Sequence, residues 1–306
     1  MQGDNKNITK QQTAEWIARP ERSNVIAMKI FVWLALLLGR KFTRIFLYPI
    51  CCYFLLFSSD AKKASKKYLT KVLNREIHLK DQFQHFFTFA STVLDRIYLL
   101  NDQHSKFNIE IHGLDVVDSM IGNTNGCFLL GTHLGSFDIM RSVGQNTRNL
   151  KINLVMYEEN ARKVNSILAA INPDNFPQII ALGKFDSMLK VKSALEAGEF
   201  VGVLGDRTIE ESGDIRCPFL GEDAKFPLGP FRLAMMLRCP IILMFGLYRG
   251  GNRYEIHFEQ LADMSNVERG NRSAFMEQAL KAYVSRIEHF CRIAPYNWFN
   301  FYDFWK

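Results

Sequence analysis

Residues 127–141, Cys-Phe-Leu-Leu-Gly-Thr-His-Leu-Gly-Ser-Phe-Asp-Ile-Met-Arg, have the pattern of a short apolar strand, a tight loop and the start of a helix. His133 falls at the carboxyl end of the strand, where open α/β sheets tend to bind their ligands. Gly135 lets the loop turn sharply, and Ser136 is a natural N-cap for the helix. This segment therefore predicts an α/β fold with a functional histidine at one edge of its sheet.

From about residue 105 the chain repeats this alternation of short apolar strands and amphipathic helices. Near-continuous apolar stretches such as Phe200–Leu204 indicate a sheet that is buried on both faces. We therefore expect an α/β domain with a largely parallel sheet and helices on both faces. The expected strands are Asn108–His112, Cys127–Gly131, Ile152–Tyr157, Gln178–Leu182, Phe200–Leu204, Ile241–Leu247 and Tyr254–Glu259. The expected helices are Phe137–Asn146, Glu159–Ile171, Phe185–Ala197, Pro230–Leu237 and Val267–Arg292.

His133 and Asp138 are the candidate catalytic pair. A carboxylate in the first turn of a helix is favoured by the helix dipole, so Asp138 is expected to stay ionised and to accept a hydrogen bond from Nδ1 of His133. That bond would leave Nε2 free to take a proton from an acceptor hydroxyl, which then attacks a thioester carbonyl. Because a thiolate leaves readily, no acyl-enzyme is needed, and backbone N–H groups at the helix start are candidates for holding the oxyanion.

The spacing of this pair is weak evidence when taken alone. With seven His and 31 acidic residues in 306 positions, roughly 0.7 matches to H-x-x-x-x-[DE] are expected by chance, and the chain has one. A lone histidine at a strand end is more often structural. Its position, between a strand end and a helix N-terminus with a glycine in the loop, is what favours a catalytic role.

The N-terminal region differs from the body of the chain. Residues 1–24 are polar and charged, unlike a secretory signal peptide. Residues 25–57 are strongly apolar but are interrupted by Arg40, Lys41 and Arg44, so neither half reaches the roughly 20 apolar residues of a membrane span. We expect two short apolar helices lying in a membrane interface, with a buried hairpin or a tilted span as alternatives. The predicted domains are 1–60, which associates with the membrane, and 61–306, a single α/β domain.

The charge and the cysteines restrict the choice of partners. A net charge of +7 suits an anionic membrane or an acidic protein, and the basic cluster in residues 62–71 is either a headgroup-binding surface or a solvated helix face. Nucleic-acid binding would explain the charge but not the apolar N-terminus. The six cysteines lack metal-ligand or disulfide spacing, so we expect all six to be buried and reduced, with no metal site.

The segment from Thr132 to Asp138 resembles the H-x4-[DE] block of the bacterial late lipid A acyltransferases, a family that includes mycobacterial phosphatidylinositol mannoside acyltransferases. The similarity continues in order through Gly198–Arg207, Pro218–Ala234 and Cys239–Leu243. An ordered set of blocks over most of the chain is far more specific than any one of them. The resemblance implies a glycerolipid-acyltransferase-like fold.

The resemblance also implies a reaction. The donor would be an acyl carrier protein or coenzyme A thioester, the acceptor a hydroxyl of a lipid or lipid-linked sugar, and no further cofactor would be needed. The location would be the cytoplasmic face of the inner (plasma) membrane. The substrate-binding residues would be Gly135, Lys184, Asp206 and Arg207, with Asp206 and Arg207 lining the site by position. Arg207 either holds a phosphate of the donor or acceptor or pairs structurally with other charges. Where many lipid A members have arginines, this chain has Lys184, Lys190 and Lys192, which leaves the acceptor open because phosphates favour bidentate arginine.

Other classes fit less well. The chain has neither the G-x-S-x-G elbow of α/β serine hydrolases nor the G-x-x-x-x-G-K-[ST] loop of NTPases. The remaining alternative is a non-catalytic, membrane-bound lipid-binding or scaffold protein with the same fold.

The sequence leaves the place of two groups of apolar residues open. Residues 296–305, with seven aromatics in ten, either anchor the membrane interface or cover the sheet, and Phe219, Phe226, Phe231, Met235 and Met236 line an acyl tunnel or are plain core.

Overall fold

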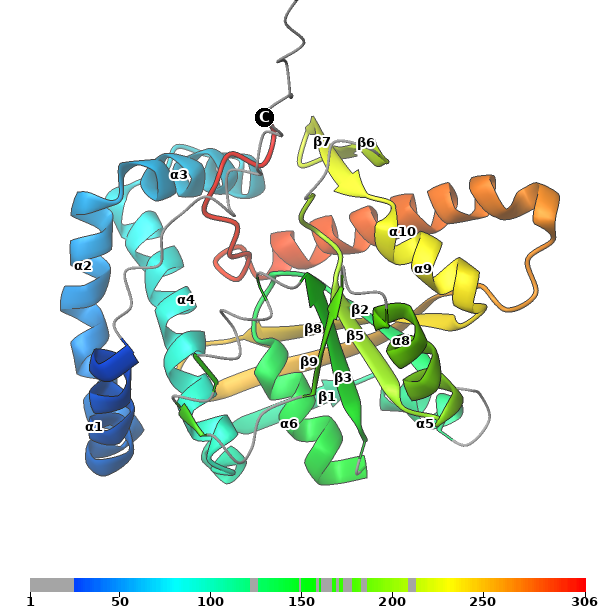
Figure 1. Cartoon of the computed structure of the whole chain (residues 1–306). Helices are drawn as coiled ribbons and strands as arrows, with labels where there is room; N and C mark the ends of the chain where they lie inside the picture. The colour runs from blue at the N-terminus through cyan, green and yellow to red at the C-terminus, as the bar shows by residue number, and fades with distance from the viewer. Residues whose placement is uncertain are drawn as a thin grey trace, which may run out of the picture.

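The computed structural model describes residues 25–121, 126–148, 150–157, 178–182, 186–208 and 213–306, together with 160, 167–168 and 171–172. Its centre is a seven-stranded sheet in the order β1-β9-β8-β2-β5-β3-β4 (Figure 1). The strands are β1 (Asn108–His112), β2 (Cys127–Gly131), β3 (Ile152–Tyr157), β4 (Ile179–Leu182), β5 (Phe200–Leu204), β8 (Pro240–Tyr248) and β9 (Arg253–Asp263).

The sheet is mostly parallel, as expected from the sequence. Strands β8, β2, β5, β3 and β4 run in one direction, while β9 is antiparallel to β8 and β1 is parallel to β9. The central strands β2 and β8 are buried along their whole length, which is typical of strands covered on both faces. The neighbouring strands β2 and β5 therefore end at the same edge of the sheet.

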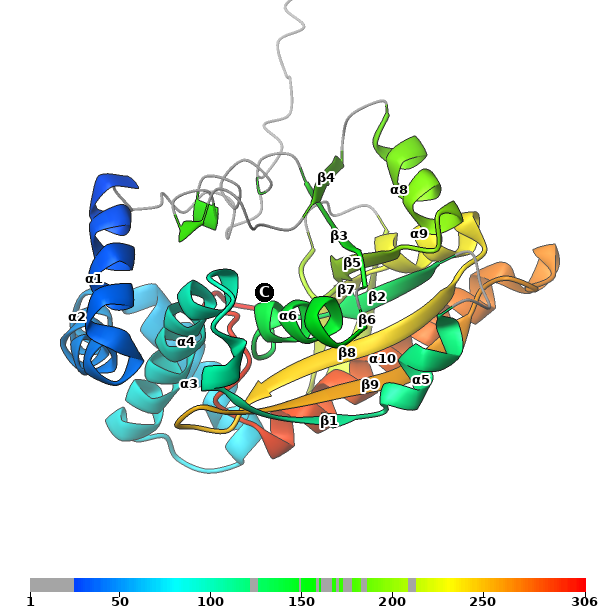
Figure 2. The ribbon, with the colours of Figure 1, turned by 90° about the horizontal axis from the view of Figure 1, so that it is seen from below.

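Helices cover both faces of the sheet (Figure 2). Alternate residues of β2 point into two separate apolar clusters, Phe128 and Leu130 into one and Cys127 and Leu129 into the other. The first cluster includes residues of α8 (Ser187–Glu196), α9 (Gly229–Leu237) and α10 (Arg272–Ile293). The second includes residues of α5 (Leu114–Met120) and α6 (Phe137–Arg148). The predicted α/β architecture is thus confirmed.

The sequence missed a two-stranded antiparallel hairpin, β6 (Asp214–Phe219) and β7 (Glu222–Pro227). Pro218 and Pro227 lie in these strands and count against a strand prediction. The turn between them, Leu220-Gly221, has positive φ at both residues (52° and 84°). The expected helix over 159–171 falls largely outside the described residues. The last helix begins at Arg272 instead of Val267, because a short 3-10 turn at Arg269–Asn271 precedes it.

Four N-terminal helices lie to one side of the sheet, at the left in Figure 1. They are α1 (Val25–Thr43), α2 (Leu47–Phe57), α3 (Ser59–Leu73) and α4 (Leu79–Leu100). As expected, the apolar region forms two helices, with a kink in α1 at Gly39, whose φ is 76°. Pro49 is in the first turn of α2, where proline costs no hydrogen bond. Among the described helices, none has the length and apolar character needed to cross a bilayer.

The two alternatives left open for the C-terminal aromatics and the Phe/Met group are settled by burial. Trp298, Phe304 and Trp305 are buried in the first apolar cluster, so this segment covers the sheet. Phe219, Phe226, Phe231 and Met235 belong to the same core, whereas Met236 is exposed. The expectation that all six cysteines are buried is wrong for Cys52, because Cys52 lies on the outward face of α2.

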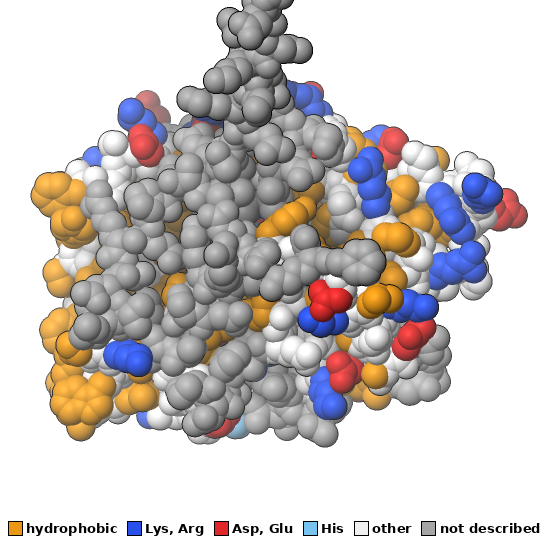
Figure 3. All heavy atoms as spheres, in the orientation of Figure 1, with side chains coloured by type: hydrophobic (Ala, Val, Ile, Leu, Met, Phe, Trp, Pro, Cys, Tyr) orange, Lys and Arg blue, Asp and Glu red, His pale blue; other side chains and the backbone are white. Residues whose placement is uncertain are grey.

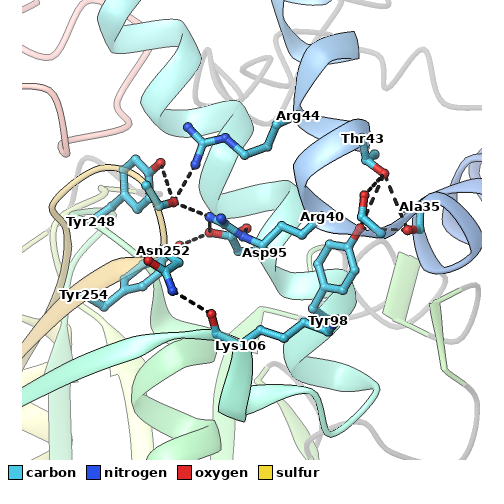
Figure 4. Close-up of polar contacts among 12 residues, drawn as sticks. Ala35, Arg40, Thr43, Arg44, Asp95, Tyr98, Lys106, Tyr248, Asn252 and Tyr254 are labelled. Atoms are coloured by element: carbon cyan, nitrogen blue, oxygen red, sulfur yellow. Dashed lines mark hydrogen bonds and ion pairs between the residues drawn. The ribbon is translucent and has the colours of Figure 1, made fainter.

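A buried ion pair fastens α1 to the rest of the protein (Figure 4). The carboxylate of Asp95, on α4, accepts bonds from Arg40 Nε at 2.7 Å and Nη2 at 2.8 Å, and from the Tyr254 hydroxyl at 2.7 Å. Arg40 and Arg44 also donate to the carbonyl of Gly251, in the turn between β8 and β9. Asp95 is completely buried, so its charge depends on these partners.

We predict that Asp95→Ala lowers the free energy of unfolding by about 3–5 kcal/mol, because it leaves the mostly buried Arg40 without its counter-charge. The matched control is Glu196→Ala, which removes an ion pair with Lys192 whose two side chains are 59% and 57% exposed. That pair should contribute less than about 1 kcal/mol. Urea unfolding followed by tryptophan fluorescence measures both, and equal losses would contradict the fastening role of Asp95.

Candidate active site

The loop that carries His133 is fixed by backbone hydrogen bonds. Gly135 N–H donates to the carbonyl of Asn297 at 2.8 Å, and Ser136 N–H donates to Gly246 at 2.7 Å. Gly135 has a φ of 75°, and a Cβ there would lie 1.9 Å from the Gly246 oxygen, so only glycine fits. The structure thus gives Gly135 a role in closing the loop onto β8. Two N–H groups at the helix start, which were expected as candidates for holding an oxyanion, are thus already engaged with carbonyls.

His133 is paired with Asp206 rather than with Asp138. Its Nδ1 is 2.7 Å from Asp206 Oδ1, and its backbone N–H is 3.2 Å and 3.1 Å from the two carboxylate oxygens. Asp206 lies just after β5, the parallel neighbour of β2, so the two strands bring both side chains to the same edge of the sheet. An ionised carboxylate accepts the Nδ1 proton, which leaves Nε2 of neutral His133 without a proton and able to act as a base.

The expected hydrogen bond between His133 and Asp138 is therefore wrong. Asp138 accepts a hydrogen bond from Arg96 Nε at 2.6 Å. The physical reason is that helix α6 packs against α4, so the first turn of α6 presents Asp138 to an arginine of that neighbouring helix. The sequence pattern correctly predicted that Asp138 lies in the first turn of a helix. It gave no information on the tertiary contact with Arg96.

The electrostatics of the pair suit proton transfer at neutral pH. Burial alone would raise the pKa of Asp206, but His133, Arg207 and Asn300 outweigh it and hold that pKa at about 2. Burial, followed by the charge of Arg207, lowers the pKa of His133 below its usual value, and Asp206 opposes both effects. The carboxylate is thus ionised and the imidazole neutral near pH 7. The His133 side chain remains one quarter exposed, which leaves a route to a substrate.

Two site residues come from the C-terminal segment and were missed in the sequence. Trp298 Nε1 donates to Asp206 Oδ2 at 3.3 Å, and Asn300 Nδ2 donates to the same oxygen at 2.8 Å. Phe299 N–H, between them, donates to the His133 carbonyl at 2.7 Å. The side chains of Trp298 and Asn300 are both buried. The one signal that the sequence offered is an asparagine within an aromatic-rich segment, because a polar side chain buried among aromatics needs hydrogen-bond partners.

The remaining predicted residues divide into two groups. Arg207 belongs to the site: its Nε donates to Asn300 Oδ1 at 2.7 Å and its Nη2 to the Phe299 carbonyl at 3.2 Å. Lys184 lies outside the described residues. Of the other lysines in its region, both on α8, Lys190 pairs with the N-cap residue Asp186 at 2.6 Å and Lys192 pairs with Glu196 at 3.4 Å. The structure therefore brings His133, Asp206 and Arg207 together and engages Asp138 elsewhere.

A family model described as bacterial lipid A biosynthesis acyltransferase matches residues 16–306. No curated protein matches the chain. The matched range contains His133, Asp206 and the C-terminal segment around them, and it confirms the resemblance seen in the sequence blocks.

We predict that Asp206→Asn lowers the pKa of His133, because Asp206 is the charge that favours the imidazolium. Asp138→Asn should leave that pKa unchanged, since Asp138 is engaged with Arg96. Carbon-13 NMR of protein labelled at histidine Cε1, with the His133 signal assigned by its loss in His133→Gln, follows the titration directly. A shift in the Asp138 variant and none in the Asp206 variant would contradict the observed pairing.

Proposed function

Because the chain belongs to the bacterial lipid A biosynthesis acyltransferase family, we propose that it moves a fatty acyl group from a thioester to a hydroxyl of a lipid acceptor, with His133 as general base. The observation that carries this proposal is the 2.7 Å contact between His133 Nδ1 and the ionised, fully buried Asp206. That contact supports a neutral imidazole with Nε2 free, which is the form a general base needs.

The proposed reaction has one proton to move. As the acceptor oxygen attacks the thioester carbonyl, its proton passes to Nε2 of His133, and Asp206 stabilises the resulting imidazolium. Collapse of the tetrahedral intermediate breaks the carbon–sulfur bond. The proton then passes from His133 to the departing sulfur, so the products are an ester and a free thiol. No acyl-enzyme and no cofactor besides the thioester are required.

For the donor we favour an acyl carrier protein thioester, with coenzyme A as the second choice. Acyl carrier proteins are acidic, and the net charge of +7 suits their electrostatic steering. The acceptor is a lipid or lipid-linked sugar. Lys190 and Lys192, two of the lysines that replace the arginines of lipid A members, are already paired with nearby carboxylates, which weighs against recognition of a strongly phosphorylated headgroup by them.

We also propose that α1 and α2 lie on the cytoplasmic face of the inner membrane. Large apolar side chains are exposed along both helices and in the 3-10 turn between them, among them Trp33, Leu37, Phe42, Ile45, Leu56 and Phe57. Hydrophobic side chains gather at the left edge in Figure 3, where these helices lie. Monomeric soluble proteins seldom expose so continuous an apolar surface. Helix α3 follows directly, and its Lys63 and Lys66 are exposed. These lysines would contact anionic lipid headgroups beside the place where the apolar surface enters the membrane.

We predict that His133→Ala lowers lipid-dependent thiol release about 10²–10⁴-fold, the usual contribution of a general base. The assay combines detergent-solubilised protein, acyl carrier protein thioester and a membrane lipid extract, and mass spectrometry of the lipids identifies the acceptor. The control is His112→Gln, a partly exposed histidine at the sheet edge that should leave the rate unchanged. Equal rates in wild type and His133→Ala would contradict the mechanism, and absence of thiol release from the wild type with any donor would favour the non-catalytic alternative.

We predict that Leu37→Glu combined with Leu56→Glu weakens binding to anionic vesicles by at least about 100-fold. The reason is that each leucine side chain contributes about 1.5–3 kcal/mol to binding when it becomes buried in the bilayer. These side chains are 65% and 73% exposed. The matched control is Leu189→Glu on α8, at 62% exposure, which lies outside the apolar surface. Vesicle sedimentation measures the binding, and an equal loss in the control would mean that α1 and α2 are not the attachment surface.

A further inference from the structure

The carboxylate of Asp206 is enclosed by donors from two parts of the chain. His133 contacts it through its ring and its backbone N–H, while Trp298 and Asn300 approach the Oδ2 oxygen from the segment that follows α10. This segment, coloured red in Figure 1, lies beside α4. It is joined to the catalytic loop by a β-bridge between Leu134 and Trp298. The carboxylate therefore depends on the C-terminal segment for part of its coordination.

Asn300 occupies a particular place in this arrangement. Its Nδ2 donates to Asp206 Oδ2 at 2.8 Å, and its Oδ1 accepts from Arg207 Nε at 2.7 Å. The two contacts fix the orientation of the amide, because only the nitrogen can donate to a carboxylate and only the oxygen can accept from a guanidinium. Asn300 is only 1% exposed, so water cannot replace either of its two hydrogen-bond partners.

We propose that Asn300 is a positioning residue for the reaction: by occupying Oδ2 of Asp206 and holding the guanidinium of Arg207, it keeps the other carboxylate oxygen directed at His133. This inference rests on the proposed function of His133 as general base. Asn300 itself touches neither the imidazole nor, in the mechanism above, the substrate. Its effect on the reaction passes through Asp206.

The surroundings of the carboxylate make it sensitive to such a change. Arg207 and His133 are the cationic or titrating groups that favour its ionised form. Three further titratable groups interact electrostatically with Asp206: Tyr302, and Tyr283 and Cys291 on α10. Burial raises the pKa of each of them, so they remain neutral. The backbone carbonyl of Trp298 contacts Nε2 of His85. Burial is the main reason that the pKa of His85 is lowered to about 4, so this histidine is neutral near pH 7. Of the two donors that the C-terminal segment supplies to Asp206, Asn300 makes the shorter contact, at 2.8 Å against 3.3 Å for Trp298.

Asn300→Asp is the most informative variant. It retains an oxygen for Arg207 but replaces the N–H by a second carboxylate oxygen that faces Asp206. Added negative charge favours the imidazolium, so the pKa of His133 should rise. A base with a raised pKa is protonated over a wider range, so the acidic limb of kcat/KM should move up by about one pH unit or more.

The chain offers a closely matched control in Asn153. Its Nδ2 donates to the carboxylate of Glu199 at 2.8 Å, and the residue is 2% exposed. It lies at the amino ends of β3 and β5, whereas His133 lies beyond the carboxyl end of β2. Asn153→Asp therefore places one carboxylate against another in the same way, but at the opposite edge of the sheet.

The experiment measures the His133 titration by histidine Cε1 NMR and the pH profile of thiol release for wild type, Asn300→Asp, Asn300→Ala and Asn153→Asp. We expect Asn300→Asp to raise both the His133 pKa and the acidic limb, with a smaller shift in the same direction for Asn300→Ala and none for Asn153→Asp. If Asn300→Asp fails to fold, the alanine variant decides.

A His133 titration unchanged by either Asn300 variant, or moved equally by Asn153→Asp, would overturn the proposal. The NMR titration needs no activity. Full thiol release by His133→Ala would therefore refute the proposed function, while the titration would still decide whether Asn300 acts on Asp206.

Discussion

The architecture around the site depends on one buried, ionised carboxylate. Asp206 is completely inaccessible, and a charge in that position persists only if several donors replace the water it has lost. Those donors come from the loop after β2 and from the C-terminal segment, which lie 73 and 92–94 positions away in the chain. The carboxylate thus joins the loop of His133 to the C-terminal segment. Removal of the carboxylate would leave the indole of Trp298 and the amide of Asn300 buried without their common acceptor.

Strand β8 links this site to the apolar helices. At its carboxyl end, the Gly246 carbonyl accepts the Ser136 N–H of the catalytic loop, and the turn that follows it offers the Gly251 carbonyl to Arg40 and Arg44 of the N-terminal region. One strand end therefore contacts both the loop of His133 and the base of the apolar surface. A central strand buried on both faces deforms little. The distance from the apolar surface to His133 is accordingly set by the fold, which the proposed reaction on a membrane lipid would require.

The sequence predicted the sheet and the position of His133 after a strand end, because both depend on local pattern. Each of the seven strands in the main sheet was expected, with bounds that differ by a few residues, since apolar runs bounded by turn residues are a local signal. The partner of His133 was assigned wrongly because two acidic residues were eligible and the choice is tertiary. Asp138 is taken by Arg96 from α4, and Asp206 is brought in by the pairing of β2 with β5. For Asn300 the sequence shows only a polar residue among aromatics. It does not show the partners of that residue, because they are brought together only once the C-terminal segment has folded back over the strand ends.

The lowered pKa of His133 has a consequence for the second half of the proposed reaction. A strong base would take the acceptor proton easily but return it slowly. Model thiols such as cysteine have a pKa of about 8.5, whereas an unperturbed imidazole has about 6.5. Burial and Arg207 lower the pKa of His133 further, which widens that gap. Proton transfer from the imidazolium to the departing sulfur is then downhill, so a lowered pKa of His133 favours the last proton transfer of the proposed reaction. Asp206 limits the effect by stabilising the imidazolium, and the balance between Arg207 and Asp206 sets how basic His133 can be.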